Sequence, residues 1–312
     1  MILIIGGNGF VGSRLINYFK TLGVEYSYTS SKNLGTSNSN FYDLDLSLKI
    51  EELQKINVAS MFNNVSSLIY LPSLNAHETQ LNKDLAKKIK VEGAKFCLQK
   101  SIEFGVKQFI NLSTCHVYGA NLSGEYKEDS SLNPANLYAE NHAIAEEELY
   151  TLSKKEKINL ISLRLANGVG CPMTKLENCW MLLVNDLCKQ IITNQTMVLN
   201  SPRSMKRDFV PFSSVEEVLY GLTLNSQIQY ESVINLSSAR TMAIHKVVNK
   251  VRNICSKVLN FTPEVVYENP SDMIEEDFKF NNEILRSKFN QISFNLDSEI
   301  ENLLINCEKW FS

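Results

Sequence analysis

The chain has 312 residues, of which 44% are apolar and 21% charged, and its formal net charge is -3. This composition is typical of a folded globular protein, and it excludes a disordered chain or a strongly basic protein that binds nucleic acid. Seven cysteines without a C-x-x-C pair favour free thiols over disulfides or a zinc site, so we expect a cytoplasmic protein without a metal centre. No apolar run approaches the roughly 20 residues of a membrane span.

Short apolar runs alternate along the chain with longer amphipathic stretches. The apolar runs predict strands at 1–5, 24–30, 41–46, 66–71, 106–113 and 158–165. Helices are predicted between them at 11–23, 48–56, 81–104 and 137–153. This alternation is typical of parallel strands joined by crossover helices, and continuous runs such as "ILII" and "LIYL" indicate strands that are buried on both faces. After Arg164 the pattern becomes less regular, with one further helix predicted near 177–193, which suggests a smaller second region.

The first strand is followed by a glycine-rich turn. "MILIIGGNGFVGSRL" places Gly6, Gly9 and Gly12 between this strand and the first helix, which begins near Phe10 and Val11. Glycine permits positive φ, and its missing Cβ lets backbone amides approach a pyrophosphate at the positive end of a helix. We interpret the motif as a dinucleotide-binding turn in which Phe10 and Val11 join the three glycines in binding the cofactor. A tight turn without a ligand is the alternative.

The end of the second strand bears on the choice of cofactor. An NAD-binding domain usually has an acidic residue there, which accepts hydrogen bonds from the adenosine ribose. Here Ser30, Ser31 and Lys32 occupy that place, and they could hold a 2′-phosphate that a carboxylate would repel. The prediction is therefore NADP, with NAD possible, although a merely polar loop has the same composition. Asp45 and Leu46 could bracket the adenine or simply begin a helix.

The stretch "NLYAENHAIAEEEL" places Tyr138 and His142 one helical turn apart. A tyrosine with a cation at i+4 is an acid/base arrangement, because positive charge lowers the pKa of a phenol from its ordinary value of about 10. The usual partner is lysine rather than histidine. The simpler interpretation of Tyr138 is a half-buried helix tyrosine.

Six segments in order resemble the extended short-chain dehydrogenase/reductase family, which contains nucleotide-sugar epimerases, dehydratases and ketoreductases. They are "GGNGFVG", "DLDLS", "INLSTCHVYG", "LYAENH", "LRLANGVGCP" and "RDFVPFSSVEEV". The resemblance implies an α/β fold with a Rossmann-type, doubly wound parallel sheet over 1–166, completed by about 207–237. It further implies a smaller substrate-binding lobe from 167–206 and 238–312, a nucleotide-sugar substrate and a homodimer.

The resemblance also implies catalytic roles. Thr114 matches the residue that hydrogen-bonds the reacting sugar oxygen, and Tyr138 matches the acid/base tyrosine. His142 stands where the family has a lysine that also hydrogen-bonds the nicotinamide ribose, and Lys90 stands where it commonly has an asparagine. To compensate, we expect Lys90 to bring an ammonium to the same pocket, and Glu146, at i+4 from His142, to favour the imidazolium.

Further residues are assigned to the substrate by the same resemblance. Arg207 matches an arginine that contacts the diphosphate, a role suited to a planar bidentate donor. Asn167 and Asn178 fall where the family often places asparagines near the phosphates, but they could be ordinary loop residues. Cys115 and His116 replace the Asp-Glu pair of the 4,6-dehydratases, which argues against elimination of water. They could shuttle protons next to a ketone or merely line the pocket.

The sequence thus predicts an NADP-dependent oxidoreductase that reduces a keto group of a nucleotide-activated 4-keto sugar. One alternative is a nucleotide-sugar 4-epimerase that holds NAD tightly. Another is a dinucleotide-binding protein whose catalysis is weakened or lost, as the missing lysine would suggest. In each case the partner is a small molecule and neither nucleic acid nor a membrane.

Overall fold

The computed structural model describes residues 1–31, 40–120, 122–224, 232–268 and 277–312. The predicted cofactor residue Lys32 lies outside these ranges. The chain forms two compact units, and each has its own hydrophobic core. The first unit comprises Met1–Ala120, Glu128–Arg164 and Val218–Ile234, and the second comprises Asn121–Lys127, Leu165–Glu217 and Asn235–Ser312.

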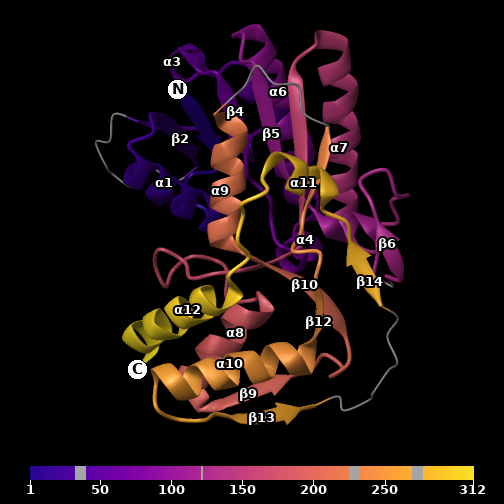
Figure 1. Cartoon of the computed structure of the whole chain (residues 1–312). Helices are drawn as coiled ribbons and strands as arrows, with labels where there is room; N and C mark the ends of the chain where they lie inside the picture. The colour runs from indigo at the N-terminus through magenta and orange to yellow at the C-terminus, as the bar shows by residue number, and fades with distance from the viewer. Residues whose placement is uncertain (32–39, 121, 225–231, 269–276) are drawn as a thin grey trace. The chain divides into compact units, whose positions relative to one another are not determined.

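The first unit is built on a seven-stranded sheet (Figure 1). Its strands are β1 (Ile2–Ile5), β2 (Tyr26–Ser30), β3 (Phe41–Asp43), β4 (Ser67–Tyr70), β5 (Gln108–Thr114), β7 (Asn159–Leu165) and β11 (Val233–Leu236). Their order across the sheet is β11-β7-β5-β4-β1-β2-β3, and β1 pairs in parallel with both β2 and β4. The order of strands along the chain reverses at β1 and β4, which is the switch point of a doubly wound fold. The predicted α/β fold class is confirmed.

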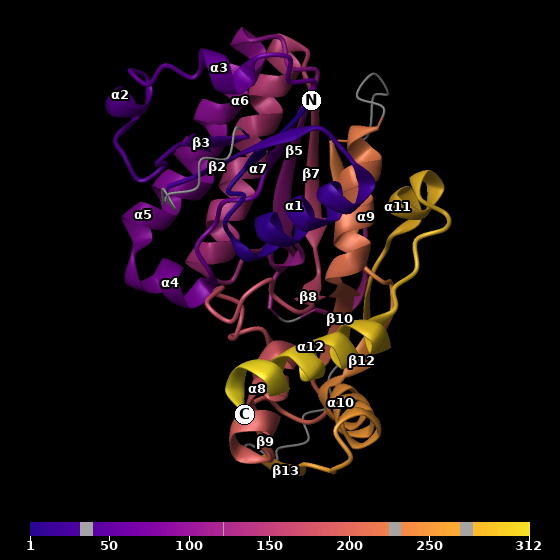
Figure 2. The ribbon, with the colours of Figure 1, turned by 90° about the vertical axis from the view of Figure 1, so that its left-hand side faces the viewer.

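Helices cover both faces of this sheet. They are α1 (Phe10–Leu22), α2 (Ile50–Leu53), α3 (Ala59–Phe62), α4 (Ala76–Leu81), α5 (Lys83–Lys87), α6 (Ala94–Glu103), α7 (Leu137–Glu156) and α9 (Phe212–Thr223). Figures 1 and 2 show α6 and α7 on one face and α1 with α9 on the other. The ring of Tyr220 in α9 lies 5.8 Å from that of Phe19 in α1. This two-sided cover explains why all four residues of β1 are buried.

The turn between β1 and α1 requires glycine at defined positions. Gly6 has a φ of 85°, and a Cβ at this residue would lie 3.0 Å from the Pro72 side chain. A Cβ on Gly12 would lie only 2.3 Å from the carbonyl oxygen of Gly6 and 2.7 Å from the Cα of Gly7. The first turn of α1 can therefore approach the end of β1 only because Gly12 has no side chain.

The single helix predicted over 81–104 is divided in the structure. A π-helical turn over Lys88–Gly93 separates α5 from α6. The hydroxyl of Tyr70 donates to the carbonyl oxygen of Ile89 in this turn, and a Cβ on Gly93 would lie 2.8 Å from the same hydroxyl. The wider turn thus accommodates a tyrosine from β4. Helical periodicity does not indicate such a tertiary contact.

The second unit contains three small sheets and its own helices. Its strands are β6 (Gly124–Tyr126), β8 (Asn167–Val169), β9 (Thr196–Leu199), β10 (Lys206–Pro211), β12 (Thr241–Ala243), β13 (Glu264–Tyr267) and β14 (Phe278–Phe280). Its helices are α8 (Leu183–Asn194), α10 (Ile244–Val258), α11 (Glu283–Lys288) and α12 (Leu296–Phe311). The helix predicted near 177–193 begins only at Leu183. The sheets have the orders β12-β10-β8, β13-β9 and β14-β6.

All seven cysteines are buried and free, and five of them lie in the second unit. In the described ranges, no group of His, Cys, Asp and Glu side chains is arranged to hold a metal ion. None of the helices in the part of the chain that the structure describes is long and apolar enough to span a membrane.

Replacement of Gly12 by alanine tests the packing of the glycine turn. The added methyl group would overlap the backbone of Gly6 and Gly7, so Gly12→Ala should lower the free energy of unfolding by about 1–3 kcal/mol or more. Gly9→Ala is the matched control, because Gly9 has a φ of -79° and its Cβ would lie 3.4 Å from the nearest atom. Urea denaturation of both variants without cofactor measures the difference. Equal stability of the two would contradict the proposed packing constraint.

Candidate active site

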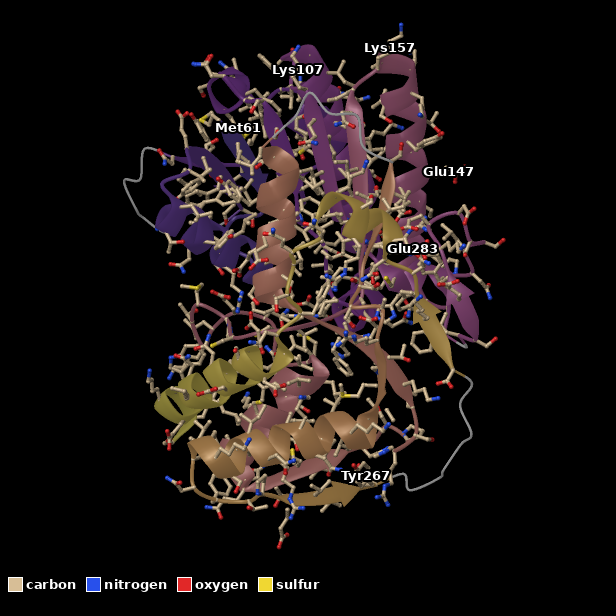
Figure 3. All side chains as sticks on the ribbon, viewed as in Figure 1. Met61, Lys107, Glu147, Lys157, Tyr267 and Glu283 are labelled. Carbon is tan, nitrogen blue, oxygen red and sulfur yellow. The ribbon has the colours of Figure 1, made fainter. Side chains whose placement is uncertain are left out.

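The candidate site lies in the first unit, where β4 and β5 end at their carboxyl termini. Thr114 is the last residue of β5, and Ser73 follows β4. Lys107 and Lys157 precede β5 and β7 and lie at the opposite, amino-terminal edge of the sheet (Figure 3). Ligands of doubly wound sheets bind at the carboxyl edge.

The structure brings Tyr138 and Thr114 together. Asn136 caps α7 with its side-chain oxygen, which accepts a hydrogen bond from the amide of Ala139 at 3.0 Å and thereby fixes the first helical turn. Tyr138 lies in this turn, and its hydroxyl is hydrogen-bonded to the Thr114 side chain. Burial raises the pKa of Tyr138, and the hydrogen bond from Thr114 opposes this effect. The phenol therefore remains protonated at neutral pH.

His142 lies one turn further along α7, as the spacing predicts. Its ring centroid is 4.6 Å from that of Tyr138, and its side chain is only 2% exposed. Burial lowers the pKa of His142 well below its ordinary value, and the positive charges of Lys90 and His116 lower it further. The Nε2 atom lies 3.1 Å from the Ser73 hydroxyl, while Nδ1 has no partner. His142 is thus a neutral imidazole beside the phenol.

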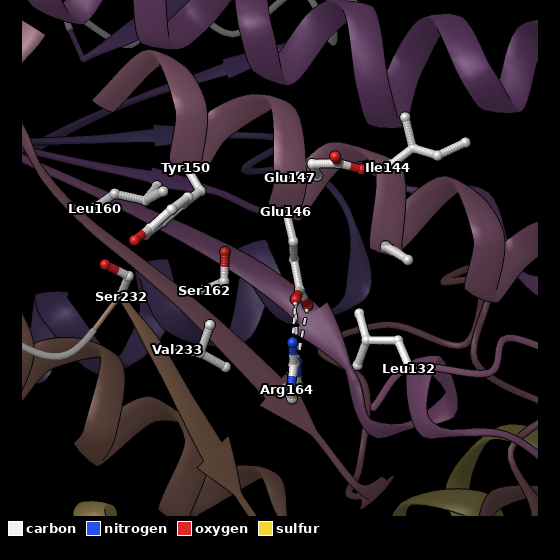
Figure 4. Close-up of a pocket in the computed structure, with 11 residues that line it drawn as sticks. Leu132, Ile144, Glu146, Glu147, Tyr150, Leu160, Ser162, Arg164, Ser232 and Val233 are labelled. Atoms are coloured by element: carbon white, nitrogen blue, oxygen red, sulfur yellow. Dashed lines mark hydrogen bonds and ion pairs between the residues drawn. The ribbon is translucent and has the colours of Figure 1, made fainter. Parts of the chain in front are cut away.

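The expectation that Glu146 favours an imidazolium at His142 is wrong. The Glu146 carboxylate forms a buried ion pair with Arg164, with an Nη2–Oε2 distance of 2.7 Å and a second contact from Nε at 3.1 Å (Figure 4). It also accepts a hydrogen bond from Ser113. This pair borders a surface cavity of about 450 Å³ that α7 and β7 help to line. The carboxylate of Glu146 is thus bound to Arg164 and Ser113, and the pKa of His142 is lowered rather than raised.

Lys90 is fully buried in the π-helical turn. Its amine donates to the side-chain oxygen of Asn111 at 2.9 Å and to the carbonyl oxygen of Leu112 at 2.7 Å, both in β5. Burial lowers the pKa of Lys90 to about 7, although the charge of Glu146 acts in the opposite direction. The hydrogen bonds of Lys90 are thus made to β5 and not to Tyr138. Its predicted catalytic role stays a prediction.

Cys115 and His116 occupy different environments. The Cys115 thiol is buried and donates to the carbonyl oxygen of Arg164 at 2.9 Å. His116 is exposed, and its ring lies 6.3 Å from that of Tyr138. The ring of His116 is thus a neighbour of the phenol ring.

The glycine turn provides a cradle for a dinucleotide. Gly9 begins α1 without a side-chain cap, and its amide donates to the carbonyl oxygen of Gly6 at 3.2 Å. The backbone at this helix start, which includes Phe10 and Val11, can approach a pyrophosphate closely because Gly9 has no side chain. A Cβ at Gly6 would crowd Pro72, as described above. These residues fit the cofactor that the sequence motif predicts.

The other predicted cofactor residues are spread along the edge near β2 and β3. Ser30 is buried at the end of β2, and Ser31 is exposed directly after it. Asp45 accepts a hydrogen bond from the amide of Ser47 at 2.9 Å, as at an ordinary turn. Leu46 belongs to the hydrophobic core of the first unit. The adenine role of Asp45 and Leu46 stays a prediction.

The predicted substrate residues Asn167, Asn178 and Arg207 belong to the second unit. Arg207 donates from Nη1 to the side-chain oxygen of Asn167 at 3.3 Å. Asn167 in turn donates to the carbonyl oxygen of Asp208 at 2.9 Å, which orients its amide. Asn178 is exposed in the loop before α8. The structure therefore joins Asn167 and Arg207 through a hydrogen bond.

Sequence reasoning missed Ser73, Asn111 and Arg164. Ser73 could have been found, because it lies just after a predicted strand, at the edge of the sheet where ligands bind. Asn111 and Arg164 carry no local signal. Their partners are Lys90 and Glu146, which lie far from them in the sequence.

The low pKa of Lys90 should make the free energy of unfolding depend on pH. The pKa of Lys90 is about 7 in the folded protein against an ordinary value of 10.5. The contribution of neutral Lys90 to stability is therefore complete above the unfolded pKa and is lost as the pH falls to about 7. The free energy of unfolding of the wild type, relative to Lys90→Met, should therefore rise between these two pH values by at most about 1.4 kcal/mol per unit.

Urea denaturation at intervals of pH provides the measurement. Lys95→Met is the matched control, because it makes the same substitution at an exposed lysine of the neighbouring helix α6. If the difference between wild type and Lys90→Met is independent of pH, the low pKa of Lys90 is excluded.

Comparison with known proteins places the chain in a family. A family model described as the NAD dependent epimerase/dehydratase family matches residues 2–220. A candidate UDP-glucose 4-epimerase from Methanocaldococcus jannaschii is 23% identical over an alignment of 282 residues, and the match covers 87% of this chain and 87% of that protein.

Two solved structures share the fold. MoeE5 in complex with UDP-glucuronic acid and NAD has a TM-score of 0.79 at 16% identity, and the match covers 99% of this chain and 98% of that one. RMD from Pseudomonas aeruginosa, complexed with NADPH, has a TM-score of 0.73 at 16% identity and covers 99% of both chains. Because the family model matches most of the chain, the protein belongs to the NAD dependent epimerase/dehydratase family, as the resemblance implied.

Proposed function

We propose that the protein reduces a keto group of a nucleotide-activated 4-keto sugar with NADPH. The observation that carries this proposal is the environment of Tyr138. Its hydroxyl is hydrogen-bonded to Thr114, the ring one turn below it is the neutral imidazole of His142, and burial raises the pKa of the phenol. A tyrosine in such surroundings keeps its proton at neutral pH and is suited to act as a general acid.

Reduction of a ketone requires such an acid. The bound nicotinamide would supply the hydride. Tyr138 would donate its proton to the carbonyl oxygen as negative charge develops there, and Thr114 would orient that oxygen. The reverse reaction needs Tyr138 as a base, and hence a positive charge beside the phenol. The neutral state of His142 therefore favours the reductive direction.

Each unit contains residues to which we assign a role in binding the cofactor or the substrate. The glycine turn would hold the pyrophosphate of the cofactor, and Ser30 with Ser31 would face its 2′-phosphate. NADPH in the complex of the Pseudomonas protein supports NADP as a cofactor of this fold. In the second unit, Arg207 would bind the diphosphate of the substrate, with its guanidinium oriented by Asn167.

A second candidate function is a 4-epimerase with tightly bound NAD. It is favoured by the similarity to the candidate UDP-glucose 4-epimerase from Methanocaldococcus jannaschii, which covers 87% of this chain. In an epimerase Tyr138 would act first as a base and then as an acid. The positive charge that His142 lacks would then have to come from the oxidised nicotinamide.

Incubation with nucleotide-activated 4-keto sugars and NADPH distinguishes these functions. A reductase consumes one NADPH for each product molecule. Tyr138→Phe should lower this rate by about 10²–10⁴-fold, because it removes the general acid. Tyr150→Phe is the matched control on the same helix, since Tyr150 is 47% exposed and should retain the rate. Interconversion of C4 epimers without net consumption of NADPH would instead establish the epimerase.

The preference for NADP can be tested at Ser30. Ser30→Asp should weaken NADP binding far more than NAD binding, because a carboxylate would face the 2′-phosphate. Ser30→Asn is the control, since the asparagine side chain has nearly the same volume as aspartate but carries no charge. Calorimetric titration of both cofactors into the three proteins gives the ratios. If NAD and NADP bind with the same affinity to the wild type, and again to Ser30→Asp, the reason for preferring NADP is removed.

A further inference from the structure

We propose that the surface cavity beside α7 is a binding site for a small neutral molecule with an apolar body and a carbonyl oxygen. The cavity has a volume of about 450 Å³ and lies within the first unit (Figure 4). Pockets that hold small molecules have volumes of about 300–1,000 Å³. The described residues that line the cavity include neither Tyr138 nor Thr114, so it is distinct from the candidate active site.

The walls of the cavity follow from the periodicities of a strand and a helix. Leu160, Ser162 and Arg164 alternate along β7 and therefore face the same side of the sheet. Ala143 and Glu147 lie one turn apart on α7, which borders this side. The walls also include the apolar side chains of Leu132, Ile144 and Val233. The body of a ligand that fits here is therefore apolar.

Ser162 offers a buried hydrogen-bond donor to the cavity. Lys90 donates to the side-chain oxygen of Asn111 at 2.9 Å, which turns the amide nitrogen of Asn111 towards Ser162. This nitrogen donates to the Ser162 hydroxyl oxygen at 3.2 Å. The direction of this bond leaves the hydroxyl proton of Ser162 available. It has no acceptor among the residues that the structure describes, and Ser162 is only 1% exposed.

Arg164 offers a second buried donor. A guanidinium carries two hydrogens on each of its Nη atoms. Both Nη1 hydrogens are used, by the Tyr118 hydroxyl and the Glu128 carbonyl oxygen. Nε and one Nη2 hydrogen donate to Glu146. The other Nη2 hydrogen has no acceptor in the described part of the chain. A buried donor without a partner is unfavourable, and a bound acceptor removes this cost.

The charge of the lining restricts the acceptor to a neutral group. The carboxylate of Glu146 compensates the guanidinium of Arg164, and the exposed carboxylate of Glu147 then gives the lining a net negative charge. An anion would be repelled, and an ammonium group cannot accept a hydrogen bond. A carbonyl oxygen is uncharged and has two lone pairs with which to accept. The polar group of the ligand is therefore a carbonyl.

Carbon-13 NMR of the Ile144 δ1 methyl group detects a ligand in the cavity, because this side chain lines it. The spectrum of Ile144→Leu assigns the signal. The probes are acetophenone, which is a neutral ketone, α-methylstyrene, in which a CH₂ group replaces the oxygen, and the anion benzoate. They are titrated without cofactor, so the result does not depend on the proposed function. Both neutral probes should shift the signal, and benzoate should bind more weakly than acetophenone.

Ser162→Ala tests the polar contact. It should raise the dissociation constant of acetophenone about fivefold, because one hydrogen bond is lost, and leave that of α-methylstyrene unchanged. α-Methylstyrene is thus the matched control, since any general disturbance of the cavity would weaken both probes alike.

Ala143→Phe tests the location of the site. The added ring should fill the cavity and abolish the response of Ile144 to both neutral probes. Thr151→Phe is the control, because it adds the same ring at an exposed residue of α7 that is not part of the lining, and it should retain the response.

Each of the following results would overturn the proposal. The Ile144 signal of the wild type does not respond to acetophenone in the millimolar range, or it still responds in Ala143→Phe. Ser162→Ala weakens the two neutral probes equally or weakens neither. Benzoate binds more tightly than acetophenone.

Discussion

The free-energy cost of buried charge governs the arrangement of the candidate active site. His142 and Lys90 are both basic side chains, and both are almost completely buried. Burial lowers the pKa of each, because the surrounding protein solvates a cation less well than water does. The phenol of Tyr138 therefore has a neutral neighbour in place of a permanently charged lysine. This electrostatic setting, more than any single contact, favours the acid form of the tyrosine.

The buried ion pair between Arg164 and Glu146 holds neighbouring residues in position. Arg164 binds Glu146 and also donates to the Tyr118 hydroxyl at 2.8 Å and to the carbonyl oxygen of Glu128 at 3.0 Å. Glu146 accepts from Ser113, the neighbour of Thr114. A buried pair is weak evidence of stability, but its geometry restrains the groups that it joins. The segment that carries Thr114 is thereby tied to α7, which carries Tyr138.

The sequence predicted those features that depend on short spacings and on local geometry. The strands and helices around the sheet, the glycine turn, and the helical turn between Tyr138 and His142 are of this kind. The partner of Glu146, the π-helical turn opposite Tyr70 and the contact of Ser73 with His142 were not predictable. Each arises from residues far apart in the chain that the parallel sheet brings together. The spacing of four residues correctly placed Glu146 one helical turn beyond His142. It did not indicate that the Glu146 carboxylate pairs with Arg164.

The titration of the Tyr138 phenol tests the central claim most directly. Carbon-13 NMR of tyrosine-labelled protein with bound NADPH gives its pKa, and the spectrum of Tyr138→Phe assigns the signal. A neutral His142 predicts a pKa above the ordinary value of about 10. A pKa close to neutrality would show that a positive charge reaches the phenol, and it would contradict the account of a site in which Tyr138 rests as an acid.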